Sequence, residues 1–115
     1  MRALTLASAD LVLVTQAGPV GEWPDALYKA EMHVACLQNG YYVALFNRIR
    51  REVSVEFSGE SFACGPDGAV VARAGLGTEE ILYAGVDLAS TASSHDRLLF
   101  LRHRQPRLFG EWLTK

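Results

Sequence analysis

The stretch FSGESFACGPDGAVVARAG, residues 57–75, decides the fold at the centre of the chain. Ser61–Cys64 is interpreted as a strand. Pro66-Asp67-Gly68 follows as a tight turn, because proline fixes φ at about −65° and glycine accepts a positive φ. Ala69–Ala74 then returns as an antiparallel strand. The stretch therefore predicts a β-hairpin, with Cys64 directly before its turn.

Two helical segments and two strands precede this hairpin. Arg2–Ala7 has the pattern of the last part of a helix, and Leu11–Val14 is a continuous apolar run typical of a strand buried on both faces. Pro24 suits the first turn of a helix, and Asn39-Gly40 suits its end. Tyr41–Phe46 is a second apolar run, so we expect a second buried strand.

The helix that begins near Pro24 carries apolar residues on two sides. A stripe at helical spacing consists of Leu27, Ala30, Val34 and Leu37, and a second strip consists of Tyr28, Met32 and Ala35. A helix with two apolar sides is expected to pack against two neighbours.

The segments outside the hairpin are less regular. Ile49–Glu56 is polar, which predicts a loop or an irregular edge. Ile81–Val86 predicts one more strand, Asp87 is expected to cap a short helix, and residues 102–113 show no clear periodicity. This order predicts an α/β fold with one sheet. About one and a half helices are too few to cover both faces of that sheet.

The composition is typical of one globular domain, which we place at residues 1–115. The formal net charge is −2, which argues against a nucleic-acid or anionic-membrane partner, since both select concentrated positive charge. No apolar run approaches the roughly 20 residues of a membrane span. Two cysteines cannot build a disulfide framework, so we expect a reduced, cytoplasmic setting.

Cys64 and Cys36 raise the question of a nucleophile. A reactive cysteine needs a helix N-terminus or a positioned basic group, and Cys64 has no basic neighbour in the sequence. Cys36 lies one helical turn after His33, but a strained turn is the usual position of a nucleophile. We interpret both cysteines as packing residues and His33 as a polar residue at the helix edge.

The spacing of the cysteines, histidines and glycines does not indicate a metal site or a phosphate site. The cysteines and the histidines, which include His95 and His103, form no C-x-x-C or H-x-x-x-H pattern. Gly75-x-Gly77 leads into Glu79-Glu80, whose carboxylates would repel phosphate. We therefore expect neither a metal site nor a phosphate-binding loop.

Basic residues form two groups in the sequence, one at Arg48, Arg50 and Arg51 and one at Arg102, His103, Arg104 and Arg107. The second group has Phe100, Phe109 and Trp112 nearby, a weak version of the pattern that binds single-stranded nucleic acid. The acidic balance favours salt bridges and a solvated tail instead.

The order of these segments resembles the C-terminal half of the carbon–nitrogen hydrolases, the nitrilase superfamily, over essentially the whole chain. The residues that carry the resemblance are Gln38-Asn39-Gly40, Asn47-Arg48, Phe57-x-Gly59-x-Ser61 and Pro66-x-Gly68. Two positions depart from the family pattern. Arg50 stands where the family often has glycine, and Thr15-Gln16 stands near a usual proline.

The resemblance implies a four-layer αββα sandwich, of which this chain would form a part, with one mixed sheet and helices on one face. In the family a cysteine forms a thioester with the substrate, a glutamate is the base, and a lysine stabilises the oxyanion. All three lie upstream of the matching segments, and neither Lys29 nor Lys115 matches the catalytic position. We therefore expect no catalytic residue, no cofactor and no hydrolysis by this chain alone.

The resemblance also implies a substrate pocket. The loop after Leu11–Val14 borders the substrate in the family, so Gln16, Ala17 and Trp23 are predicted to line the pocket. The substrate of the complete enzyme would be a small-molecule amide, carbamoyl compound or nitrile.

The expected protein partner follows from the uncovered sheet. A face that carries Tyr42, Ala44 and Phe46, or the alternate residues of the same strand, would be covered by the missing N-terminal half or by a second copy. We expect a homo-oligomer, paired through the strip of Tyr28, Met32 and Ala35. The alternative is a non-catalytic interaction or oligomerisation module derived from the same fold.

Overall fold

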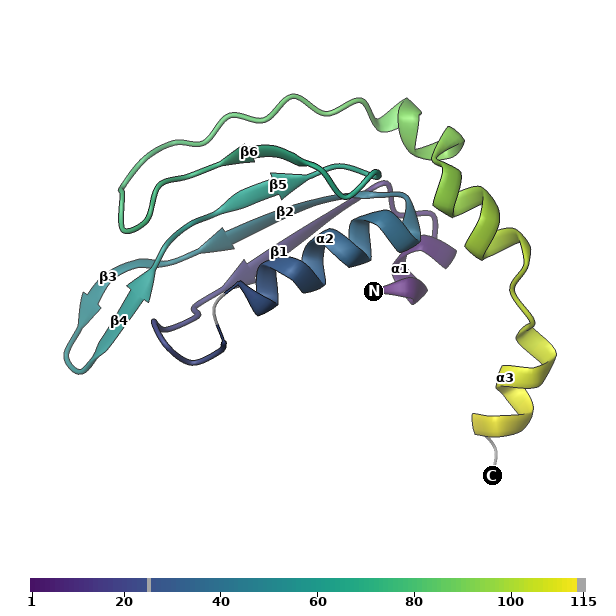
Figure 1. Cartoon of the computed structure of the whole chain (residues 1–115), viewed down its shortest axis with the longest axis horizontal. Helices are drawn as coiled ribbons and strands as arrows, with labels where there is room; N and C mark the ends of the chain where they lie inside the picture. Colours follow the sequence, from purple (N-terminus) through teal and green to yellow (C-terminus); the bar gives the residue numbers. More distant parts are fainter. Residues whose placement is uncertain (25, 114–115) are drawn as a thin grey trace.

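A four-stranded mixed sheet forms the centre of the computed structural model, which describes residues 1–24 and 26–113. Its strands lie in the order β1 (Leu11–Gln16), β2 (Tyr42–Asn47), β5 (Phe62–Cys64) and β6 (Val70–Arg73) (Figure 1). β1 and β2 are parallel, with Leu11 opposite Tyr42 and Gln16 opposite Asn47. The other neighbouring pairs are antiparallel. The prediction of an α/β fold built on one main sheet is confirmed.

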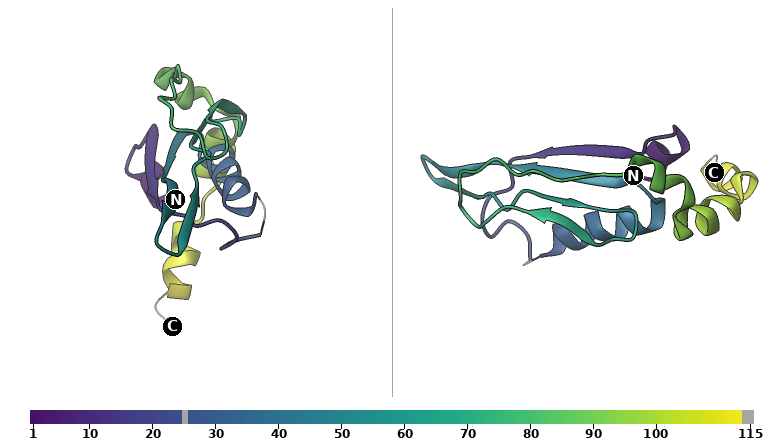
Figure 2. Two further views of the ribbon diagram at one scale, coloured as in Figure 1. Left: turned by 90° about the vertical axis from the view of Figure 1, so that its left-hand side faces the viewer. Right: turned by 90° about the horizontal axis from the view of Figure 1, so that it is seen from above.

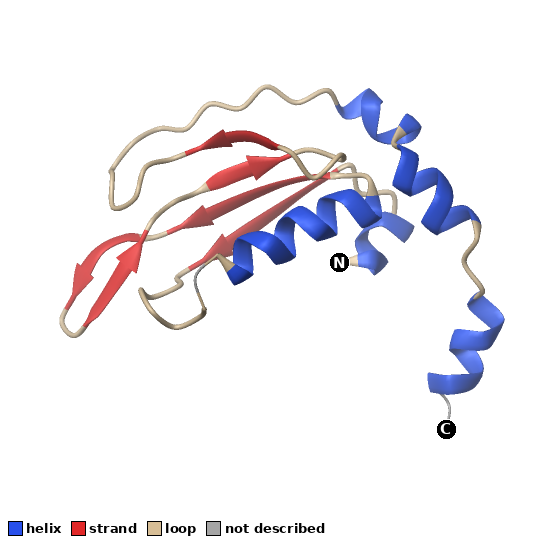
Figure 3. Ribbon diagram, viewed as in Figure 1, coloured by secondary structure: helices blue, strands red, loops and turns tan. Residues whose placement is uncertain are grey.

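Two helices accompany the parallel strands, α1 (Arg2–Leu6) before β1 and α2 (Leu27–Asn39) between β1 and β2. Parallel strands need a crossover connection, and α2 provides it along one face of the sheet (Figure 3). Gly40 ends α2 with a φ of 63°, and its N–H donates to the Cys36 carbonyl over 2.8 Å. This left-handed conformation favours glycine at the helix end.

The core lies between α2 and the sheet, and it consists of Met32, Cys36, Tyr41, Val43, Leu45, Phe62 and Cys64. Tyr28 packs against this core, and Met32 and Ala35 are buried. The expectation that this strip pairs subunits is therefore wrong, because the strip faces its own sheet. The stripe that contains Leu27, Val34 and Leu37 is the side of α2 that stays exposed.

The opposite face of the sheet carries a second set of apolar residues. Leu13, Ala44, Ala63 and Ala72 pair in register from β1 to β6 and form a row across the sheet. On this face Leu13 is 63% exposed and Phe46 is 51% exposed. Figure 2 shows α2 on one side of the strands only. The described residues thus form one sheet layer with helical cover on one face.

The segment predicted as a loop, Ile49–Glu56, instead forms most of a hairpin of β3 (Ile49–Glu52) and β4 (Val55–Ser58). The hairpin projects beyond the end of the main sheet (Figure 1). Both of its faces meet solvent, so its sequence is polar and gives no apolar signal. Its backbone pairing and the Arg48 guanidinium, 5.0 Å from the centre of the Phe57 ring, stabilise it instead.

The prediction of a strand at Ile81–Val86 is wrong. Residues 79–87 form neither helix nor strand, and Ile81 and Tyr83 are exposed. Apolar residues predict a strand only where a partner edge completes the ladder, and the described residues provide none there. The 3₁₀ helix η1 (Leu88–Ser93) follows, and the Asp87 carboxylate accepts from the Ala89 N–H, so the predicted cap is confirmed.

The tail, which showed no periodicity, is helical in the structure. A π-helical segment, η2 (Arg97–Leu101), precedes α3 (Pro106–Leu113), which extends away from the sheet (Figure 1). Mixed basic and aromatic residues conceal such short helices because few turns repeat. Within residues 1–24 and 26–113, no helix is long and apolar enough to cross a membrane.

Candidate functional site

The carboxyl ends of the two parallel strands meet at one edge of the sheet. Gln16, the last residue of β1, lies opposite Asn47, the last residue of β2. The loop that leads to α2 starts directly after Gln16. Ligand sites in α/β sheets form outside the carboxyl ends of the strands. The loop after Gln16 and the residues that hold it are therefore the candidate site.

Asn47 holds this edge together through its side chain. Its Oδ1 accepts from the Gly18 N–H at 2.9 Å and from the Arg48 N–H at 3.0 Å. Its Nδ2 donates to the Gly59 carbonyl at 3.0 Å. Its backbone N–H donates to the Ser61 hydroxyl at 3.0 Å. The residues that carried the family resemblance, Asn47, Gly59 and Ser61, thus form one hydrogen-bonded cluster under the loop.

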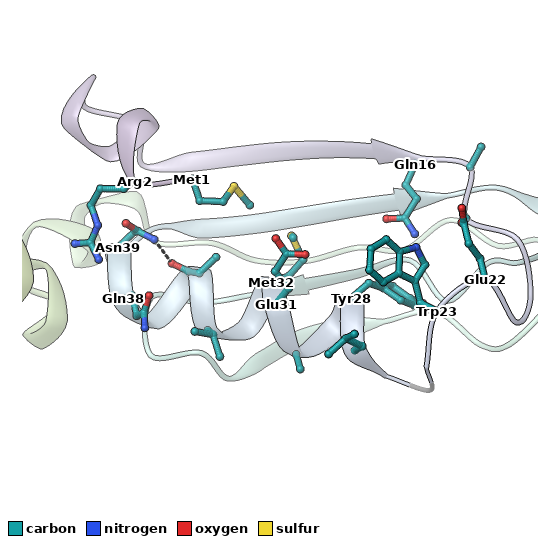
Figure 4. Close-up of a pocket in the computed structure, with 16 residues that line it drawn as sticks. Met1, Arg2, Gln16, Glu22, Trp23, Tyr28, Glu31, Met32, Gln38 and Asn39 are labelled. Atoms are coloured by element: carbon teal, nitrogen blue, oxygen red, sulfur yellow. Dashed lines mark hydrogen bonds between the residues drawn. The ribbon is translucent and has the colours of Figure 1, made fainter. Parts of the chain in front are cut away.

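A groove of about 840 Å³ runs beside this loop and along α2 (Figure 4). We call it the α2 groove. Its residues are Met1, Arg2, Gln16, Ala17, Gly18, Glu22, Trp23, Leu27, Tyr28, Ala30, Glu31, Met32, Val34, Ala35, Gln38 and Asn39. Gln16, Ala17 and Trp23, the residues predicted to line a pocket, therefore share one concave surface. Their contact with a substrate stays a prediction.

A smaller cavity of about 410 Å³ adjoins the groove and shares Gln16, Gly18, Trp23 and Tyr28 with it. We call it the Lys29 cavity, because Lys29 lies in its wall beside Glu60. Lys29 Nζ lies 2.5 Å from Glu60 Oε1, with the two side chains 11% and 23% exposed. Charged groups are buried in proteins only when they are paired. Lys29 and Glu60 thus form a mostly buried ion pair in the wall of this cavity.

The sequence reasoning missed the Lys29–Glu60 pair. A signal was present, because Lys29, Met32 and Cys36 lie at i, i+3 and i+7, on the side of α2 that faces the sheet. A lysine in such a buried series requires an acidic partner. Which acidic residue it contacts depends on the turn at Gly59 and Glu60, where both residues have positive φ angles of 70° and 55°.

Both cysteines lie in the core, as predicted. Each is fully buried, with the Cys36 Sγ 3.6 Å from the Cys64 carbonyl and the Cys64 Sγ 3.8 Å from the Met32 carbonyl. Contact with Cys64, together with burial, raises the pKa of the Cys36 thiol. A fully buried thiol is not accessible to a substrate, and this holds for both cysteines. Cys64 is therefore a core residue of the hairpin.

His33 packs at the edge of the same helix. Its ring stacks on Phe62 at 5.3 Å between ring centres, and its Nδ1 forms a 2.8 Å hydrogen bond with the Gly68 carbonyl. These contacts hold the His33 ring at the helix edge. The described part of the chain contains no group of three or more His, Cys, Asp or Glu side chains placed to hold a metal ion.

Comparisons with known proteins identify a family for this sequence. The sequence profile of the family "Carbon-nitrogen hydrolase" matches residues 1–96. A protein of Pseudomonas protegens named "Hydrolase in pqqF 5'region" is 29% identical over 110 residues, which cover 96% of this chain and 38% of that protein.

Two solved structures show the same architecture. The carbon-nitrogen hydrolase from Helicobacter pylori G27 superposes with a TM-score of 0.83 at 23% identity, over 97% of this chain and 43% of that one. A variant of the amidase from Nesterenkonia sp. AN1 in complex with butyramide superposes with a TM-score of 0.68 at 26% identity, over 96% of this chain and 38% of that one. The chain thus spans about two fifths of the length of the relatives it matches.

Proposed function

Because this chain belongs to the carbon-nitrogen hydrolase family, we propose that it forms the C-terminal part of an enzyme that hydrolyses C–N bonds in small molecules. Residues 1–115 would be one part of a single hydrolase domain. The proposed substrates are amides, N-carbamoyl compounds or nitriles, and amides are the preferred class. The similarity to the Nesterenkonia enzyme favours amides. That enzyme is an amidase of the nitrilase superfamily, it is 26% identical to this chain, and a variant of it was solved with butyramide.

The proposed chemistry follows the family mechanism. A cysteine thiolate attacks the amide carbon, and a lysine stabilises the oxyanion that forms. Ammonia leaves with a proton from a glutamic acid, and a thioester remains. Water activated by the same glutamate then attacks the thioester and releases the carboxylic acid and the thiol. A variant of the Nesterenkonia amidase shows covalent addition of the acetamide moiety of fluoroacetamide at its active-site cysteine, which supports a nucleophilic cysteine in that enzyme.

One observation carries the proposal that the triad comes from outside these residues. The family profile matches most of the chain, yet both cysteines are fully buried in the core. A chain with this fold and without an accessible thiol needs a nucleophile from another part of the enzyme. The proposed role of this chain is to supply the pocket wall formed by Gln16, Ala17 and Trp23.

The uncovered surfaces of the chain support the same proposal. β1 is an edge strand of the sheet, the sheet face with Leu13 and Phe46 is exposed, and the α2 groove includes Gln16, the last residue of β1. A facing sheet would cover the exposed face, a further strand would pair with the edge of β1, and a helix beside α2 would cover the groove. The proposed occupant is the rest of the αββα sandwich.

A complementation experiment tests the proposal. The 115-residue chain is assayed for ammonia release from butyramide alone and with a second chain, namely the part of the Pseudomonas protegens relative outside the matched 110 residues. We expect no release by the chain alone and release by the mixture. Cys36→Ala serves as a control that should keep the activity of the mixture. Hydrolysis by the chain alone that Cys36→Ala or Cys64→Ala abolishes would overturn the proposal.

The alternative function is a non-catalytic module that self-associates. The exposed stripe of Leu27, Val34 and Leu37 on α2 favours it, because a helix stripe of this kind packs against a partner helix. The mass of the purified chain in solution distinguishes the two functions. The module is supported if the purified chain forms a stable homo-oligomer, if Val34→Glu dissociates that oligomer, and if the mixture with the second chain releases no ammonia.

A further inference from the structure

The two charged side chains in the wall of the Lys29 cavity keep hydrogen-bonding capacity that their contact does not use. An ammonium group has three N–H donors, and a carboxylate has about four acceptor sites. The contact joins Lys29 Nζ to Glu60 Oε1 only. Among residues 1–24 and 26–113, the structure gives neither charged group another hydrogen-bond or ion-pair partner; Lys29 Nζ also lies over the Tyr28 ring. Both groups can therefore bind a further molecule.

Tyr28 also contributes to the wall of this cavity. The hydroxyl of Tyr28 is buried and has no hydrogen-bond partner in the described part of the chain. The Lys29 Nζ lies 5.6 Å from the centre of the Tyr28 ring, so this side chain and the charge pair are neighbours. Because the Tyr28 hydroxyl has essentially no accessible surface, it offers no contact to a ligand, and the charge pair alone carries the site.

The charges of the pair restrict the kind of ligand. The pair is neutral as a unit and presents donors beside acceptors. An anion would be repelled by Glu60 and a cation by Lys29, whereas an apolar group would leave the remaining donors and acceptors of the pair unused. A neutral group that accepts and donates at once, such as a carboxamide or a ureido group, suits both.

We propose that the Lys29 cavity binds a second, neutral carboxamide-like group of the substrate, remote from the bond that is hydrolysed. Its carbonyl oxygen accepts from the Lys29 ammonium, and its N–H donates to the Glu60 carboxylate. Gln16 and Trp23 line both this cavity and the α2 groove, so one small molecule can reach both. The assignment of this ligand as a substrate rests on the proposed function.

Binding to the 115-residue chain tests the inference without catalysis. Succinamide, which has two carboxamides, is titrated against butyramide and succinate, with the Trp23 indole N–H and the Gln16 side-chain amide as NMR probes. We expect succinamide to bind about tenfold more tightly than butyramide, the gain of one or two net hydrogen bonds. Succinate is expected not to bind at these probes. Equal affinity for succinamide and butyramide, or no binding of succinamide, would overturn the inference.

Two variants test whether the charge pair causes the tighter binding of succinamide than of butyramide. Lys29→Met combined with Glu60→Leu removes both charges and keeps the volume, so we expect equal affinities for succinamide and butyramide. Arg50→Gln disrupts an exposed ion pair with Glu79 and should leave the preference unchanged. A preference that persists in the Lys29/Glu60 double variant contradicts the assignment.

Assays of the complemented enzyme separate this inference from the proposed function. Hydrolysis of butyramide without a higher kcat/KM for succinamide would keep the proposed function and exclude the substrate role of the cavity. Selective binding of succinamide without hydrolysis of any amide would keep the binding site and exclude the proposed function.

Discussion

The Gly18 backbone N–H donates to the Asn47 side-chain oxygen over 2.9 Å and joins two segments that are 29 residues apart in the sequence. This bond fixes the start of the loop that carries Trp23 to the carboxyl end of β2. The same side chain donates to the Gly59 carbonyl, so Asn47 also holds the turn that carries Glu60. One amide group therefore positions both walls of the candidate site.

We predict that Asn47→Ala lowers the free energy of unfolding by about 2–3 kcal/mol, because it leaves several backbone groups without partners. Ser61→Ala removes the hydroxyl that pairs with the Asn47 backbone and should cost about 1 kcal/mol. Urea unfolding of the two variants measures the difference. Arg51→Ala, at an exposed position, is the control with little effect. A loss in Asn47→Ala no larger than in that control would show that the cluster does not stabilise the edge.

The buried pair of Lys29 and Glu60 makes a separate prediction about stability. Lys29→Met leaves the Glu60 carboxylate without its partner, so we expect a loss of about 3 kcal/mol in the free energy of unfolding. Lys29→Met with Glu60→Leu should lose less than the single variant, because an apolar pair can replace an ion pair at little cost. A double-mutant cycle in urea measures this coupling. Additive losses would mean that the two charges do not interact.

Asp10 links the amino end of β1 to the C-terminal segment and makes stability depend on pH. Hydrogen bonds from Arg97 and Thr91, both 2.7 Å long, lower the pKa of the Asp10 carboxyl, and burial partly opposes them. A folded-state pKa below the unfolded value stabilises the fold above the unfolded pKa. This contribution is lost as the pH falls below about 4, the ordinary value for aspartate.

Thermal unfolding between pH 7 and pH 3 tests this link. The dependence of Tm on pH should be weaker in Asp10→Asn than in the unchanged chain. Asp96→Asn removes an acid next to Arg97 in the sequence and serves as the matched control. The prediction does not hold if Asp10→Asn and the unchanged chain lose the same Tm on acidification.

The sequence predicted most elements of the main sheet and its helix within a few residues. β1, β2, β5 and α2 leave an apolar run or stripe, whereas β6, which is mostly exposed, was located from the turn at Pro66-Asp67-Gly68. The β3–β4 hairpin was missed because both its faces meet solvent, and Ile81–Val86 was predicted as a strand because the pattern does not show whether a partner edge exists. Apolar periodicity reports burial, whereas pairing depends on neighbours elsewhere in the chain.

The candidate site was predicted in part. Gln16, Ala17 and Trp23 come from one loop, so the sequence kept them together, and the structure places all three in the α2 groove. Glu60 reaches Lys29 across 31 residues and a turn with positive φ angles. A contact of this kind depends on the positions of α2 and the hairpin in space, which the sequence pattern does not supply.

The burial of the two cysteines leads to the last prediction. Because Cys36 and Cys64 are fully buried, and contact with Cys64 and burial raise the pKa of Cys36, we expect neither to react with a thiol reagent at pH 8 in the folded chain. Both should react within seconds in 8 M urea, roughly a denaturing concentration for a small domain. Ser93→Cys, at an exposed position in η1, should react at once in the folded chain and is the control for reagent access. Rapid labelling of Cys64 in the folded chain would contradict its place in the core, and would make it a candidate nucleophile after all.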